Sequence, residues 1–182
     1  MSKKNKGNTK AMQSQEWMED ALFNLMHTKP YNKITIQDIT DSAQLSRRTF
    51  YRNYEKKDEI LLGYFYRICK KYELNLKNAK AQTFKDIANV FFNTMYEHVD
   101  FLRLMNKHNI IDLFINEMDA FILPVHMELR GRSNNQLEAA RFAITFGIGG
   151  FGRVLILWLN EGAAKSPKEL TALTEEAIRL LL

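Results

Sequence analysis

Apolar side chains recur every three or four residues along most of this 182-residue chain, and this spacing favours helices over strands. The pattern is plain between Trp17 and Met26 and again between Ile60 and Tyr72. Glycine and proline, which interrupt helices, number only 8 and 3. A β-sandwich, a collagen or a disordered chain contains far more of them. The sequence therefore predicts an all-α fold of about nine helices.

Capping residues and prolines divide this pattern into separate helices. The first long helices are expected over residues 9–28 and 57–80, with two short helices between them that begin after Thr35 and Ser46. Further helices are expected after Thr83, within 101–130 as a short and a longer helix bent or broken near Pro124, from Asn135 to near Gly162, and from Ser166 to Leu182. An acidic residue stands three positions after Thr35, Thr83, Asn135 and Ser166, as in a capping box. Residues 1–8 remain as a basic flexible tail and 131–134 as a loop.

The formal net charge of +5 belongs to the N-terminal part of the chain. Lysine and arginine outnumber aspartate and glutamate in residues 1–57, whereas the two kinds balance in residues 58–182. A basic first third joined to a neutral remainder suggests that one end meets a polyanion. The tail lysines can lie along DNA as an arm or can belong to a disordered solubilising tail; they are Lys3, Lys4, Lys6 and Lys10.

Residues 34–62, ITIQDITDSAQLSRRTFYRNYEKKDEILL, predict a helix-turn-helix unit. Two short helices are joined by a turn at Ala43-Gln44-Leu45, and apolar residues can lock them together at a steep angle. In such a unit the second helix lies in the DNA major groove and reads base edges with its first residues. Arg47 and Arg48 project from that first turn, and either can donate two hydrogen bonds to a guanine.

A recurring set of side chains accompanies this unit, namely Thr35, Asp38-Ile39, Ala43, Leu45-Ser46, Thr49-Phe50-Tyr51, Asn53-Tyr54 and Lys57-Asp58-Glu59-Ile60-Leu61. The set resembles the TetR family of bacterial transcriptional regulators, and the length and layout of the whole chain fit that family as well. Two positions depart from its pattern. Gln44 stands where the family usually places glycine, and a left-handed glutamine there costs about 1–2 kcal/mol. Thr40 stands where the family prefers alanine at the helix crossing.

The resemblance implies that successive segments of the chain have different functions. Residues 9–56 would form the helix-turn-helix DNA-binding domain, 57–80 a connecting helix, and 81–182 a larger helical domain for ligand binding and dimerisation. Phosphate contacts would come from Thr35, Thr49, Tyr51, Asn53 and Lys57. Arg47 and Arg48 would read bases, with Gln44 and Arg52 as further candidates. Because repression is the common mode of the family, the resemblance implies a homodimeric repressor that an effector releases from a near-palindromic operator.

Apolar side chains, most of them aromatic residues or methionines, gather on the middle helices of the C-terminal two thirds. They can line a pocket for a small apolar or aromatic effector, or they can be ordinary core. The candidates are Phe91, Phe92, Met95, Tyr96, Phe101, Leu104, Met105, Phe114 and Met118. As an alternative, this domain docks a protein co-regulator and the protein acts as an activator.

Four glycines, Gly147, Gly149, Gly150 and Gly152, fall in one expected helix. Each costs about 1 kcal/mol relative to alanine, so the cluster suggests that another backbone or a ligand approaches closely. The string GIGGFG follows no strand, which argues against a nucleotide loop. Residues 158–170 resemble the end of the last two helices of the family, which pair with their copies in many members. The predicted dimer interface is Gly149, Phe151, Gly152, Leu155, Trp158, Leu170 and Leu173.

Other classes of protein fit the sequence less well. The four histidines, His27, His98, His108 and His126, lack metal-ligand spacing, and Cys69 reads as a buried apolar residue, so we expect no enzyme, metal or cofactor. A sequence-independent architectural DNA protein is a further alternative. Residues 142–159 are apolar enough to suggest a membrane span, but Arg153 and the glycines favour a helix buried between protein surfaces. The polar N-terminus has no apolar signal region, so we expect a cytoplasmic protein.

Overall fold

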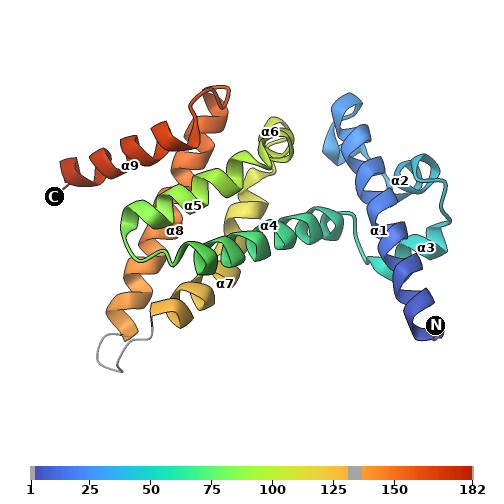
Figure 1. Ribbon diagram of the computed structural model, residues 1–182. Helices are drawn as coiled ribbons and strands as arrows, with labels where there is room; N and C mark the ends of the chain where they lie inside the picture. Colours follow the sequence, from blue (N-terminus) through green and yellow to red (C-terminus); the bar gives the residue numbers. More distant parts are fainter. Residues whose placement is uncertain (1–2, 131–136, 182) are drawn as a thin grey trace. The chain divides into compact units, whose positions relative to one another are not determined.

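The computed structural model describes residues 3–130 and 137–181 (Figure 1). Within these residues nine α-helices and one short 3-10 helix follow one another, and none of the described residues forms a strand. The prediction of an all-α fold is confirmed. The expected loop at 131–134 and the expected cap at Asn135 lie outside the described residues.

The chain divides into two compact units, residues 1–66 and 67–182. The N-terminal unit contains α1 (Lys3–Thr28), η1 (Tyr31–Lys33), α2 (Ile36–Ser42), α3 (Arg47–Asn53) and the first part of α4 (Asp58–Ala79). The C-terminal unit contains the rest of α4 together with α5 (Phe84–Tyr96), α6 (Val99–Lys107), α7 (Ile111–Arg130), α8 (Leu137–Asn160) and α9 (Pro167–Leu181). The division falls inside α4, between Tyr66 and Arg67.

The N-terminal unit is organised around α1, which contacts both α2 and α3. Met18 and Leu22 on α1, Ile39 on α2 and Phe50 on α3 are completely buried. Burying an aliphatic or aromatic side chain of this size contributes about 1.5–3 kcal/mol. This core therefore fixes the position of α3, the second helix of the predicted helix-turn-helix unit.

The C-terminal unit is built from helix pairs, with α5 against α9 and α7 against α8 (Figure 1). Trp158 on α8 is 2% exposed, and its Nε1 donates a hydrogen bond of 3.0 Å to the carbonyl oxygen of Lys165. This bond closes the turn between α8 and α9, where Gly162 and Ala163 both have left-handed backbone conformations. The turn lets α9 fold back toward α5.

Several boundaries differ from the sequence-based expectation. Helix α1 begins at Lys3 rather than at residue 9. This stretch contains Gly7 and two asparagines, which disfavour a helix, but also three lysines, which favour one. The side chains of residues 3–9 lie outside the described part of the structure, so the role of the tail lysines stays a prediction. The break within 101–130 falls at residues 108–110, where Asn109 is left-handed, and α7 continues through Pro124. The 3-10 helix η1 was not expected from the sequence.

Helix α8 is the one described helix that is long and apolar enough to cross a membrane. Its buried face, which includes Ile144, Ile148 and Leu155, packs within the C-terminal unit. Its other face exposes Phe142 and Phe146, whose side chains are 71% and 78% accessible. Thus one side of α8 meets the core of this chain, as expected, while the other side is uncovered in a single copy.

Candidate nucleic-acid interface and cavity

Thr35 fixes the start of α2 through a capping box. The backbone N–H of Asp38 donates to the Thr35 hydroxyl at 3.1 Å, and the Thr35 N–H donates to the Asp38 carboxylate at 2.7 Å. Lys29 donates to the same carboxylate at 2.6 Å. The hydrogen bond from Lys29, followed by those from Thr35, lowers the pKa of Asp38 to about 2. The start of α2 is therefore tied to the segment that follows α1.

The region of the turn between α2 and α3 contains Gln44 and Thr40, the two residues that depart from the sequence pattern described above. Gln44 has a φ of 55°, which is a left-handed conformation. The N–H of Leu45 closes the turn by donating to the carbonyl oxygen of Thr40 at 2.9 Å. Thr40 is fully buried, and its hydroxyl donates to the carbonyl oxygen of Ile36 at 3.0 Å. The extra hydroxyl is therefore satisfied inside its own helix.

Helix α3 presents a basic and aromatic face to solvent. Ser46 caps the helix by accepting from the N–H of Thr49 at 3.1 Å, and Phe50 anchors it in the core. The exposed residues of this face are Arg47, Arg48, Tyr51 and Arg52. Arg47 and Tyr51 lie together, with the guanidinium 6.0 Å from the ring centroid. Asn53 is half-buried and donates to the carbonyl oxygen of Thr49 at 2.7 Å.

Lys57 makes contacts within the protein that the sequence did not indicate. Its ammonium donates hydrogen bonds of 2.7 Å to the carbonyl oxygens of both Tyr31 and Ile34, and lies 4.3 Å from the centroid of the Tyr31 ring. Burial lowers the pKa of Lys57. The Tyr31 hydroxyl in turn donates to the carboxylate of Asp58, and burial, followed by this hydrogen bond, raises its pKa. Lys57 thus joins η1 to the start of α4, using two of its three N–H donors.

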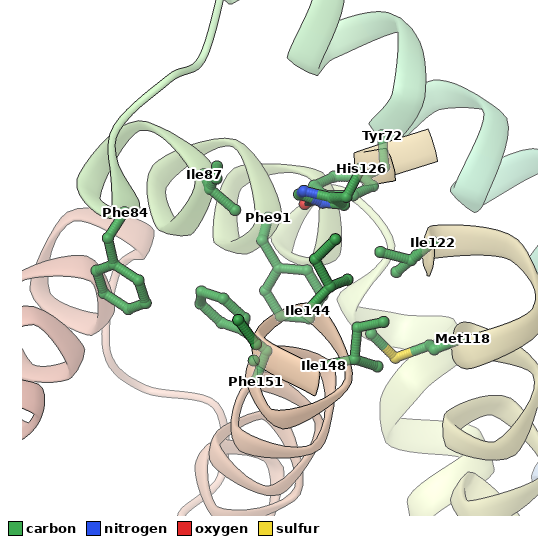
Figure 2. A pocket seen from close by; sticks show the side chains of 12 residues that line it. Tyr72, Phe84, Ile87, Phe91, Met118, Ile122, His126, Ile144, Ile148 and Phe151 are labelled. Carbon is green, nitrogen blue, oxygen red and sulfur yellow. Dashed lines mark hydrogen bonds between the residues drawn. The ribbon is translucent and has the colours of Figure 1, made fainter. Parts of the chain in front are cut away.

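The C-terminal unit contains a cavity of about 110 Å³ (Figure 2). Four helices, α4, α5, α7 and α8, supply its lining, which is Tyr72, Phe84, Ile87, Phe91, Met118, Ile122, His126, Ala143, Ile144, Gly147, Ile148 and Phe151. The lining is apolar except at one point. There the Tyr72 hydroxyl and the Nε2 atom of His126 form a hydrogen bond of 2.9 Å. Such a space can hold an apolar molecule.

Comparison with known proteins agrees with this architecture. Residues 20–64 match the family model described as "Bacterial regulatory proteins, tetR family", and residues 82–180 match one described as "Transcriptional regulator C-terminal region". The chain belongs to the TetR family. This is a family of transcriptional regulators with a DNA-binding helix-turn-helix, and α2 and α3 lie within the first matched segment. A relative in Bacillus subtilis (strain 168), described as the uncharacterized HTH-type transcriptional regulator YxbF, is 23% identical over 168 residues, which cover 85% of this chain. The chain spans 42% of the length of that relative.

The cavity of this TetR-family chain includes two of the residues predicted for an effector pocket, Phe91 and Met118. Six others are buried but do not border it, namely Phe92, Met95, Phe101, Leu104, Met105 and Phe114, and Tyr96 is 48% exposed. Periodicity identifies the buried face of a helix, but not which part of that face borders a void. Tyr72 and His126 also line the cavity, although they are not among the predicted pocket residues. The four-residue steps from Met118 to Ile122 to His126 could have placed His126 on the same helix face.

Most of the predicted dimer-interface residues lie in the core of their own chain. Leu155, Trp158 and Leu170 are at most 4% exposed, so they present no surface to a second copy. A side chain at Gly152 would lie 3.2 Å from Ile115, and Phe151 stacks on Phe84 inside the unit.

Only two members of the predicted interface are exposed. Gly149 has no atom within 4 Å of an added Cβ, and the Leu173 side chain is 48% accessible. Because α8 has apolar side chains on both faces, the glycines and the family resemblance did not distinguish its buried face from its exposed face.

Proposed function

We propose that this chain is a cytoplasmic repressor that binds a near-palindromic operator as a homodimer and leaves it when an effector occupies the C-terminal cavity. The observation that carries the proposal is the exposed face of α3. Arg47 and Arg48 stand there in the first turn of a short helix whose start is fixed by Ser46 and whose other face is buried by Phe50. This is the arrangement in which a recognition helix offers guanidinium groups to base edges.

Phosphate contacts are proposed for residues around this face. Thr35 lies at the N-terminus of α2, where backbone N–H groups attract an anion. Tyr51 is exposed on α3 and can contact a phosphate. Arg52 on the same helix and the left-handed Gln44 in the turn before it are also exposed, and we propose them as further candidates for base contacts. Thr49, Asn53 and Lys57 are half-buried, so we propose that their contribution to phosphate binding is smaller.

The uncovered face of α8 supports the proposal of a homodimer. Phe142 and Phe146 on α8, together with Leu157, are more than half exposed, and Leu173 on α9 is nearly so. Gly149 lies on the same side of α8 and leaves room for a close approach of another helix. A C2 dimer sets two recognition helices about 34–36 Å apart, one turn of DNA. The same apolar face could instead bind a protein co-regulator, which the experiment below separates.

The decisive experiment measures the dissociation constant for DNA from the intergenic region beside the gene and for a random duplex of equal length. A regulator prefers its operator by about a thousandfold or more. Equal affinity for the two duplexes would overturn the proposal and favour an architectural role. Light scattering on the protein alone then distinguishes a homodimer from a monomer that requires another protein.

A further inference from the structure

We infer that the cavity of the C-terminal unit takes a small, uncharged, single-ring compound with one hydrogen-bonding group, and that Tyr72 supplies its polar contact. The inference rests on the proposed function, in which this cavity receives the effector. It adds the chemical class of that effector, which follows from the size, walls and polarity of the space.

The volume of the cavity limits the ligand to about one ring. At about 110 Å³ it is smaller than the roughly 150 Å³ apolar cavity that accepts benzene in another protein, and well below the roughly 300–1,000 Å³ of pockets for drug-sized molecules. The cavity is partly open to solvent, so a substituent can extend outward. A fused polycyclic compound exceeds the space available.

The walls favour a flat ligand. Figure 2 shows Phe84 and Phe151 on one side of the space and Met118 with Ile122 on the other. The rings of Phe84 and Phe151 stack with centroids 5.5 Å apart, and Phe151 also lies 5.0 Å from Phe91. Aromatic faces and edges of this kind gain extra stabilisation from an added ring in a stacked or edge-on position.

The charge of the lining argues for an uncharged ligand. None of the described lining residues is a lysine, arginine, aspartate or glutamate. An ion that is buried against apolar walls loses much of its hydration free energy. No residue of opposite charge is present in the described lining to compensate for that loss. An anionic or cationic ring compound should therefore bind poorly.

The polar end of the cavity is the pair formed by Tyr72 and His126. Their side chains are hydrogen-bonded at 2.9 Å, and the residues are only 2% and 7% exposed. Burial raises the pKa of Tyr72, so its hydroxyl stays protonated. A hydroxyl has one donor and two acceptor positions, and the bond to His126 uses one of the three. A ligand hydroxyl can therefore bond to Tyr72 without breaking the pair.

Gly147 is a position at which a larger side chain can block the cavity. It lines the cavity, and a Cβ added there meets no atom within 4 Å. Gly150 on the same helix is equally open, but it does not line the cavity. A leucine at position 147 should therefore fill the cavity. A leucine at position 150 should leave the cavity empty.

The test uses the full chain and three probes of similar size, which are phenol, toluene and benzoate, with binding followed by ligand-observed NMR titration in the absence of DNA. We expect phenol to bind about tenfold more tightly than toluene, because phenol can form one buried hydrogen bond that toluene cannot. Benzoate should show no saturable binding. Tyr72→Phe should reduce the affinity for phenol to that for toluene. Gly147→Leu should abolish binding of both, and Gly150→Leu should preserve it, with circular dichroism confirming that each variant folds.

Each contrary result has a defined meaning. Benzoate binding as well as phenol would overturn the uncharged class, and equal binding of phenol and toluene would overturn the role of Tyr72. Retained binding in Gly147→Leu would place the site elsewhere. A phenol-saturated protein with an unchanged dissociation constant for its operator would contradict the proposed effector control while leaving the ligand class intact.

Discussion

Arg47 and Tyr51 share the exposed face of α3, where the guanidinium lies 6.0 Å from the ring. A guanidinium held over an aromatic ring loses less conformational freedom when it binds a base. Arg47→Ala should weaken operator binding by about 1–3 kcal/mol and relax the preference at one base pair. Fluorescence anisotropy on a set of singly substituted operators measures both effects. Equal losses on operator and random duplex would instead assign Arg47 to a phosphate.

Lys57 illustrates a basic residue with an internal role. Its two hydrogen bonds reach carbonyl oxygens 26 and 23 residues earlier in the chain. Lys57→Met should therefore lower the free energy of unfolding by about 1–3 kcal/mol, because two buried carbonyl groups lose their donor. Urea unfolding measures this change. Lys56→Met, at an exposed neighbouring position, should stay within about 0.5 kcal/mol of the native protein.

The opposite result would support the phosphate contact that the sequence predicts for Lys57. If it mainly binds phosphate, Lys57→Met should leave the free energy of unfolding unchanged. The dependence of DNA binding on salt concentration would then weaken by about one unit of slope.

Asp38 makes the N-terminal unit sensitive to acid. Its pKa in the folded protein is about 2, below the ordinary value of 3.8, so its ionised form stabilises the fold. That contribution is complete above the ordinary value and is lost as the pH falls from 3.8 to about 2. Asp38→Asn should be less stable than the native protein at neutral pH, and the difference should shrink over this acid range. A difference that stays constant down to pH 2 in urea unfolding would contradict the prediction.

At the level of elements, helix starts were predictable because a cap involves neighbours in the sequence. Thr35, Thr83 and Ser166 each form the expected bonds with an acidic residue three positions later. The cavity was not predictable, because Tyr72 and His126 are 54 residues apart and meet only through the packing of α4 and α7. The predicted DNA-contacting residues are an intermediate case, because the sequence indicated their helix but not their exposure. The sequence predicted the position of α3. The packing of the helix determines that Thr49 and Asn53 are half-buried while Arg47 and Arg48 are exposed.

The turn between α2 and α3 carries a local conformational cost. Gln44 has a φ of 55°, which glycine adopts without the steric penalty of a Cβ. Gln44→Gly should therefore raise the free energy of unfolding by about 0.5–1 kcal/mol, after the larger chain entropy of glycine is subtracted. Ala43→Gly is the matched control, because Ala43 has a φ of −78° and should lose stability instead. Loss of stability in both variants would show that the glutamine side chain stabilises the turn.

At the level of the whole molecule, the proposed homodimer predicts that the apolar face of α8 affects DNA binding. Phe146 is 78% exposed in a single chain, so replacing it removes little packing from the monomer. Phe146→Glu should place a charge in the proposed interface and convert the dimer to a monomer in light scattering. The monomer meets one half-site only, so its operator affinity should fall by about 10²–10⁴, the usual gain from linking two binding events.

Leu74→Glu is the control for this prediction. Leu74 lies on α4, is 56% exposed and belongs to the same unit, but it is not part of the α8 face. It should therefore leave the protein dimeric and its operator affinity unchanged. If Phe146→Glu stays dimeric, the interface lies on another face. If the native protein is monomeric yet binds its operator tightly only with a second protein, the exposed face of α8 serves that protein instead.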